Sequence, residues 1–218
     1  MSSSQIPRAA ADQNAALRAK YDRTAFFYDL LDFPWEMIYR NWRPKLIGDV
    51  RGKVLEAGVG TGRNLPHYHP SVELVGIDLN DRMLGKAARR AKTSSCKIEL
   101  TQDDATVMRS LEDNQFDWLV STFMCCVMPN ELQTAAIEQF GRVLKPGGRF
   151  RILEIVYSKH RKIRHRQDLF APFVEKVYGA RFDRHTLRYL EQSAKLQVTG
   201  TSYLKDDVYL LIEGIRHQ

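Results

Sequence analysis

Three glycines at alternate positions follow a short apolar run in this chain almost directly. The run is Lys53-Val54-Leu55-Glu56, and the glycines are Gly58, Gly60 and Gly62. Glycine adopts positive φ angles and lets a ligand approach the backbone closely, because it has no Cβ atom. In an open parallel sheet, ligands bind beyond the carboxyl ends of the strands. The pattern therefore predicts a buried strand that ends in a ligand-binding loop.

Strand-like and helix-like segments alternate along the chain after this loop. Strands are expected at 53–56, 72–78, 98–101, 116–122 and 149–156, with helices that begin near Asn80 and Asn130. This alternation calls for a parallel sheet with helices on both faces. Two further strands, 196–203 and 208–215, are separated by four residues, which is too short for a parallel crossover. We therefore expect an α/β fold with a seven-stranded, mostly parallel sheet that ends in an antiparallel hairpin.

The segment before the glycine loop is helical in pattern and rich in aromatic residues. Two helices are expected, at 15–31 and 35–48, with a break at Pro34 because proline cannot continue the backbone ladder. The length of 218 residues fits one domain with a full-sized core. Residues 1–48 are therefore expected to form an N-terminal part of a single domain whose main body is 49–218.

The charge of the chain is concentrated in one stretch. The net charge is +7, and residues 159–188 carry nine basic and three acidic side chains, which gives +6. Such a patch suits an anionic partner such as a membrane or nucleic acid, although a solvated helix face has the same composition. Three cysteines make no disulfide framework, and no run of apolar residues resembles a signal peptide or a membrane span. These features favour a cytoplasmic protein, with peripheral contact to an anionic membrane through 159–188 as one interpretation.

The loop is better suited to S-adenosylmethionine than to a dinucleotide. Asp78 ends the second strand, twenty residues after Gly58, where an acid accepts hydrogen bonds from ribose hydroxyls in both kinds of site. A dinucleotide fingerprint needs its third glycine at position 63, where this chain has Arg63. Here the third glycine comes one residue earlier and Glu56 precedes the loop. S-adenosylmethionine has no pyrophosphate, so this tighter loop suffices.

Several segments resemble the motifs of class I S-adenosylmethionine-dependent methyltransferases, which have a Rossmann-like fold. They are VLEAGVGTGRNLPHY, GIDLNDRML, DDAT, FDWLVSTF and VLKPGGRF, in family order. YDRTAFFYD resembles the N-terminal lid motif of the ubiquinone and menaquinone biosynthesis methyltransferases, which implies that 1–48 is a helical lid on a methyltransferase domain at 49–218. LEIVYSKH and GARFDRHTLRYLEQS are similar to the microsomal alkyl-thiol methyltransferases. The bacterial phospholipid N-methyltransferases share the LPHY and GIDL features.

The resemblance implies cofactor-binding roles for a set of residues: Tyr21, Tyr28, Glu56, Gly58, Gly60, Gly62, Asp78, Leu79, Met83, Asp104, Ala105 and Thr122. The glycines would pass under the methionine and ribose, and the acid before them would contact the amino end. Asp78 would hold the ribose, Leu79 and Met83 would flank the adenine, and Asp104 and Ala105 would bind its edge. The two tyrosines would close over the cofactor, although packing against the sheet accounts for them equally well.

The acceptor side of the site is less defined. Methyl transfer is an in-line displacement that needs alignment, and a base only if the nucleophile arrives protonated. Glu154, near the carboxyl end of the fifth strand, and His160 are the candidate catalytic residues; a structural acid and a solvated histidine are the alternatives. Cys125 and Cys126 are adjacent, which is not the spacing of zinc ligands, so no metal site is expected.

The acceptor itself is expected to be a small molecule. Ser121-Thr122-Phe123-Met124 stands where an amino-methylating nucleic-acid enzyme carries Asn/Asp-Pro-Pro-aromatic, so no nucleic acid is expected. The C-terminal resemblance favours a thiol or similar soft nucleophile. An ethanolamine phospholipid at the membrane surface is the main alternative, because the aromatic residues near Trp35 and the basic stretch form an amphipathic combination. A quinone precursor methylated at carbon, and a cofactor-binding protein without activity, are the others.

Overall fold

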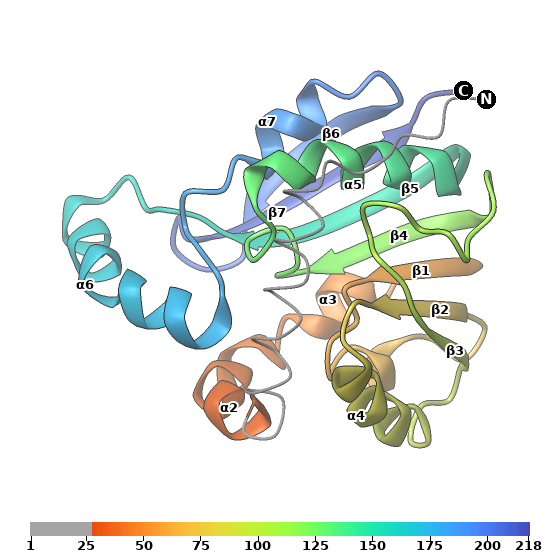
Figure 1. The fold of residues 1–218 in the computed structure, drawn as a ribbon, viewed down its shortest axis with the longest axis horizontal. Coiled ribbons are helices and arrows are strands. Elements are labelled where there is room, and N and C mark those ends of the chain that lie inside the picture. The colour runs from red at the N-terminus through yellow and green to blue at the C-terminus, as the bar shows by residue number, and fades with distance from the viewer. Residues whose placement is uncertain (1–27) are drawn as a thin grey trace.

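The fold is described from a computed structural model that defines residues 28–218; for residues 28–32 and 34 only the backbone is described. A seven-stranded sheet runs through the molecule in the order β3-β2-β1-β4-β5-β7-β6 (Figure 1). Its strands are β1 (Lys53–Ala57), β2 (Glu73–Asp78), β3 (Lys97–Gln102), β4 (Phe116–Thr122), β5 (Leu144–Ile155), β6 (Leu196–Tyr203) and β7 (Tyr209–Arg216). β1 to β5 pair in parallel, and β7 is antiparallel to both β5 and β6. The predicted α/β fold with a C-terminal antiparallel hairpin is confirmed.

Helices cover both faces of this sheet. They are α2 (Tyr28–Tyr39), α3 (Arg43–Ile47), α4 (Asp81–Ala91), α5 (Asn130–Val143), α6 (Arg161–Tyr178) and α7 (Thr186–Glu191), with a 3₁₀ turn at Leu65–His67. α5 and α7 lie on one face and α3 and α4 on the other, while α2 and α6 lie beyond the carboxyl ends of the parallel strands (Figure 1). None of the helices within residues 28–218 is long and apolar enough to cross a membrane.

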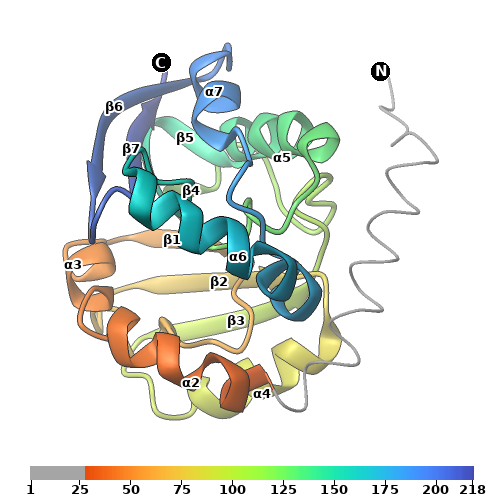
Figure 2. The ribbon, with the colours of Figure 1, turned by 90° about the vertical axis from the view of Figure 1, so that its left-hand side faces the viewer.

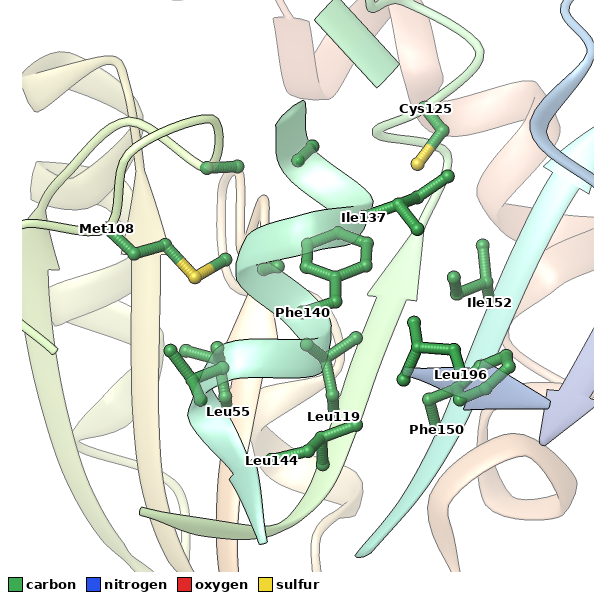
Figure 3. Packing of buried hydrophobic residues seen from close by; sticks show 14 of the residues in the cluster. Leu55, Met108, Leu119, Cys125, Ile137, Phe140, Leu144, Phe150, Ile152 and Leu196 are labelled. Atoms are coloured by element: carbon green, nitrogen blue, oxygen red, sulfur yellow. The ribbon is translucent and has the colours of Figure 1, made fainter. Parts of the chain in front are cut away.

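The alternation of side chains along the strands divides the core into two layers. On β1, Leu55 faces the cluster beneath α5, whereas Val54 faces the cluster beneath α3 and α4. Figure 3 shows part of the first cluster, in which Ile137 and Phe140 of α5 lie over Leu119 of β4. Because the central strands are buried on both faces, they form near-continuous apolar runs.

Two prolines lie inside helices, which corrects one expectation. α2 continues through Pro34, so the break predicted there is wrong; the expected helix at 15–27 lies outside the described residues. α6 likewise continues through Pro172. An internal proline costs a helix about 3 kcal/mol. In α6 tertiary contacts offset this cost, because Val174 is buried and the buried Gln167 side chain hydrogen-bonds the Ser158 N–H at 2.8 Å and the Val156 carbonyl at 2.9 Å.

The signals at the starts of elements are of mixed reliability. The predicted helix after Asn80 is confirmed, and the Asn80 side chain caps it by accepting a hydrogen bond from the Met83 N–H at 3.0 Å. β5 begins at Leu144 rather than at Arg149, because the backbone through Gly147 joins the strand across an irregularity in its pairing with β4.

β7 lies between β5 and β6, and Gly214 lets it fit there. A Cβ atom at Gly214 would stand 2.2 Å from the Gln197 carbonyl oxygen of β6 and 2.2 Å from the Phe150 ring of β5. Both neighbours are fixed, the first by the strand backbone and the second by the core. No side chain larger than hydrogen fits at this position without moving one of them.

Gly214→Ala is therefore expected to destabilise the protein by about 1–3 kcal/mol or more, the usual cost of overpacking a core. Gly200→Ala is the matched control on the paired strand, because a Cβ there meets no atom within 4 Å. Urea unfolding should show a lower midpoint for the first variant and a midpoint near the wild type for the second. Equal midpoints would contradict this account.

Candidate functional site

A cavity lies at the carboxyl ends of β1, β2 and β4, where ligand sites occur in open α/β sheets. Nine of the predicted cofactor-binding residues line it: Glu56, Gly58, Gly60, Asp78, Leu79, Met83, Asp104, Ala105 and Thr122. Gly62 is not among the lining residues. Tyr21 lies outside the described residues, and of Tyr28 only the backbone, at the start of α2, is described. The structure thus brings most of the predicted set together.

The glycine loop is held by backbone hydrogen bonds to the end of β2. The N–H groups of Gly58 and Val59 both donate to the Ile77 carbonyl at 2.9 Å, and the Gly60 N–H donates to Asp78 Oδ2 at 2.8 Å. Gly60 has φ +55°, and a Cβ there would meet no protein atom within 4 Å, so its open side faces the cavity. A Cβ at Gly62 would instead stand 2.8 Å from Ala87 Cα, so Gly62 allows the loop to pack against α4.

Asp78 connects the loop to the helix that follows. Its Oδ1 accepts a hydrogen bond from the Asn80 N–H at 2.9 Å, while Oδ2 is the acceptor for Gly60. Burial raises the pKa of Asp78, and the two N–H groups oppose this shift because they stabilise the charged form. Each oxygen retains a further lone pair on the side of the cavity. The carboxylate is therefore prepared to accept hydrogen bonds from a ligand.

Glu56 belongs to a buried polar network that the sequence did not indicate. The Asn64 side-chain amide donates to Glu56 Oε1 at 2.7 Å and to Thr122 Oγ1 at 3.2 Å, and Arg43 donates to Asn64 Oδ1. Arg43 also pairs with Glu36 of α2 at 2.5 Å. Burial raises the pKa of Glu56 to about 7, against the effects of Asn64, Tyr68 and the Arg43 charge. The network joins α2 and α3 to the base of the cavity.

The two predicted catalytic residues do not line this cavity. Glu154 is 2% exposed, and its Oε1 accepts a hydrogen bond from the Cys125 N–H at 3.0 Å, so it holds the loop after β4 from behind. Burial raises the pKa of Glu154 to about 8 and the pKa of both neighbouring thiols well above their ordinary value. His160 is exposed and precedes α6. Among residues 28–218, no three His, Cys, Asp or Glu side chains are grouped as metal ligands.

A second cavity, which we call the aromatic chamber, adjoins the first. Tyr39, Phe123 and Val127 line both. Its other lining residues come from α2, the loop after β4, β5, α6 and β7: Trp35, Cys126, Ile155, Val174, Tyr178, Ala180, Phe182 and Tyr209. The ring centroids of Tyr39 and Phe123 are 4.8 Å apart, and those of Tyr39 and Tyr209 are 5.8 Å apart. No described residue that lines the chamber is charged, so it suits an apolar ligand.

Comparisons with known proteins agree with the fold and the cavity. The family profile described as a methyltransferase domain matches residues 54–148. The chain is 31% identical over 150 residues to a phosphatidylethanolamine N-methyltransferase of Cereibacter sphaeroides, which covers 66% of this chain and 68% of that protein. It is 30% identical over 182 residues to a demethylmenaquinone methyltransferase of Staphylococcus aureus, which covers 80% of this chain and 72% of that protein.

A solved structure shows the same fold. The phosphoethanolamine N-methyltransferase 2 of Haemonchus contortus, in complex with phosphomonomethylethanolamine and S-adenosylhomocysteine, superposes with a TM-score of 0.68 at 16% identity, over 93% of this chain and 61% of that one. Fold, glycine loop and cavity define a nucleotide-cofactor enzyme of the Rossmann-like type. The chain belongs to the class I S-adenosylmethionine-dependent methyltransferases.

The buried carboxyl of Glu154 predicts how stability depends on pH. In the unfolded chain this group ionises near pH 4.5, whereas in the folded protein it keeps its proton to about pH 8. Between these values the folded state binds more protons, so stability falls as the pH rises. Glu56 contributes in the same direction up to about pH 7. Glu154→Gln should therefore lose Tm less steeply than the wild type between pH 5 and 8.

Calorimetric Tm values at several pH values measure this difference. Glu73→Gln, at an exposed site on β2, is the matched control and should follow the wild type. Parallel curves for Glu154→Gln and the wild type would contradict the assigned protonation.

Proposed function

We propose that this methyltransferase transfers a methyl group from S-adenosylmethionine to the amine of an acceptor with a large apolar body, of the kind that a phospholipid headgroup amine provides. The observation that carries the proposal is the uncharged aromatic chamber, which shares Tyr39, Phe123 and Val127 with the cofactor cavity. Such a chamber suits an apolar body and gives a small hydrophilic thiol little to bind.

The residues of the first cavity fit the cofactor. Glu56 Oε2 is buried and makes no hydrogen bond with a described residue, which suits the ammonium of the methionine part. Asp78 would hold the ribose, Leu79 and Met83 would flank the adenine, and Asp104 and Ala105 would meet its edge. The open side of Gly60 allows close contact with the backbone. The roles of Tyr21 and Tyr28 as a lid remain predictions.

The chain's own residues contribute alignment and exclusion of water. When bound, S-adenosylmethionine supplies a methyl group that its sulfonium has already activated. The shared wall formed by Tyr39, Phe123 and Val127 would hold the acceptor amine in line with that methyl group. Alignment of this kind contributes about 7–11 kcal/mol to a displacement. The aromatic faces would stabilise the positive charge that nitrogen gains, by about 0.5–2 kcal/mol for each well-placed ring.

Glu154 acts on this chemistry as a positioning residue. Its carboxyl holds the Cys125 N–H, and Cys125 belongs to the loop that carries Phe123 and Val127. No charged group among the described residues lines the chamber, so the amine is expected to arrive unprotonated. His160 has no position near the chamber from which to take a proton.

Carbon methylation of a quinone precursor is the second candidate. The similarity to a demethylmenaquinone methyltransferase over 80% of this chain favours it, and an aromatic chamber would also accept a flat ring. Carbon methylation, however, requires a base to remove the ring or hydroxyl proton. The lack of a charged lining residue therefore ranks the amine first. The thiol acceptor favoured by the sequence is not supported by these relatives.

Blocking the chamber tests the acceptor. Ala180 is buried and lines the chamber but not the cofactor cavity, so Ala180→Trp should fill it. Transfer of labelled methyl to phosphatidylethanolamine in detergent micelles should fall at least tenfold, while calorimetry shows unchanged cofactor affinity. Ala180→Ser is the control and should stay active. Label appearing in small thiols or quinone precursors, but not in phosphatidylethanolamine, would overturn the proposed acceptor.

The ribose contact is tested by Asp78→Ala. Loss of hydrogen bonds to a charged group should weaken S-adenosylmethionine binding by about 1.5–3 kcal/mol. Asp81→Ala, three residues along and exposed, is the control and should bind as the wild type does. Calorimetry that shows unchanged affinity in a folded Asp78→Ala variant would exclude the assignment.

A further inference from the structure

We infer that the protein docks on an anionic lipid bilayer through α2 and α6, and that the acceptor passes from the bilayer into the aromatic chamber between them. The inference rests on the proposed function only in that the acceptor is a lipid. The docking surface is defined by six apolar side chains: Phe33, Trp35, Met37, Leu169, Phe170 and Phe173.

These side chains are unusual in their exposure. Phe33 is 59% exposed, Trp35 36% and Met37 48%, and on α6 Leu169 is 67%, Phe170 61% and Phe173 52% exposed. Among the described side chains, Tyr203 is the one other large apolar or aromatic residue with comparable exposure. Soluble proteins seldom leave such side chains gathered on neighbouring elements unless they bind a partner. α2 and α6 lie on the same side of the molecule (Figure 2).

One face of α6 carries both the basic and the apolar groups. Lys162, Arg166, Leu169 and Phe173 are spaced by four, three and four residues, which places them along one face of the helix. All four are exposed, whereas Gln167 and Val174 turn toward the protein. The face is therefore basic in its first half and apolar in its second.

α2 repeats this arrangement on a smaller scale. Phe33 and Met37 are four residues apart and share a face, and the exposed Arg40 follows three residues later. Basic side chains beside exposed aromatic and aliphatic ones suit the boundary between lipid headgroups and acyl chains. The two helices thus present the same chemistry.

The chamber connects this surface to the cofactor cavity. Trp35 and Tyr39 of α2 and Val174 and Tyr178 of α6 line the chamber. Both helices that expose apolar side chains to solvent therefore also form chamber walls. A lipid that leaves the bilayer at this surface reaches the chamber without crossing water.

The charge on the surface selects a bilayer as the occupant. α6 carries five basic and two acidic side chains, and the acids Asp168 and Glu175 lie off the face that holds Phe173. Anionic lipids attract such a face, and this attraction weakens when the Debye length falls from about 10 Å at 0.1 M salt to about 3 Å at 1 M. A protein partner or a second copy is an outcome that the experiment can detect.

Vesicle co-sedimentation without cofactor tests the docking. The full chain should be retained on vesicles of equal parts phosphatidylcholine and phosphatidylglycerol at low salt, and much less on phosphatidylcholine alone or at 1 M salt. Replacing Leu169, Phe170 and Phe173 together by serine should lower retention at least tenfold without loss of folding, because all three are exposed. Lys162→Glu with Arg166→Glu should do the same.

The matched control reverses two charges elsewhere. Arg89→Glu with Lys92→Glu, at exposed sites at and after the end of α4, should leave retention unchanged. The inference is overturned if wild-type protein is not retained on the anionic vesicles, or if the serine variant is retained equally. It is also overturned if the serine variant converts a dimer to a monomer in solution. Methyl transfer to micellar phosphatidylethanolamine that persists without vesicle retention would leave the proposed function standing.

Discussion

The carboxylate of Asp78 connects three elements whose relative positions define the cofactor cavity. One oxygen holds the Gly60 N–H of the loop after β1, and the other holds the N–H of Asn80, whose side chain caps α4. The Ile77 carbonyl, one residue earlier, accepts the next two N–H groups of the loop. The end of β2 thus orders the loop, the strand and the helix together. The same hydrogen bonds keep a half-buried carboxylate charged beside the space that a ribose would occupy.

The parts of the site that the sequence predicted are those whose partners lie close in the chain. Gly60, Asp78 and Asn80 fall within one strand–loop–strand–helix unit, so their spacing already implied their geometry. Arg43 and the chamber ring Tyr209 were missed because they meet the cavity walls only through the order of the sheet. β7 enters that order between β5 and β6, and no local pattern indicates this.

Glu154 and the internal prolines show two further limits of sequence interpretation. Glu154 does stand near the carboxyl end of β5, but its neighbours Leu153 and Ile155 belong to the core layer on the chamber side, whereas Glu154 faces the other layer. Strand parity, rather than distance along the strand, decides which cavity a side chain meets. Pro172 was taken as an interruption, yet burial on the inner face of α6 outweighs one missing hydrogen bond.

The position of β7 has a consequence for the order in which the protein acquires its shape during synthesis. β6 is made first, but its sheet neighbour is β7, so it has no strand to pair with until residues 209–216 have left the ribosome. Tyr209, a wall of the aromatic chamber, arrives in the same segment. The glycine loop and its carboxylate are complete more than a hundred residues earlier. A nascent chain can therefore present a cofactor cavity before the chamber beside it exists.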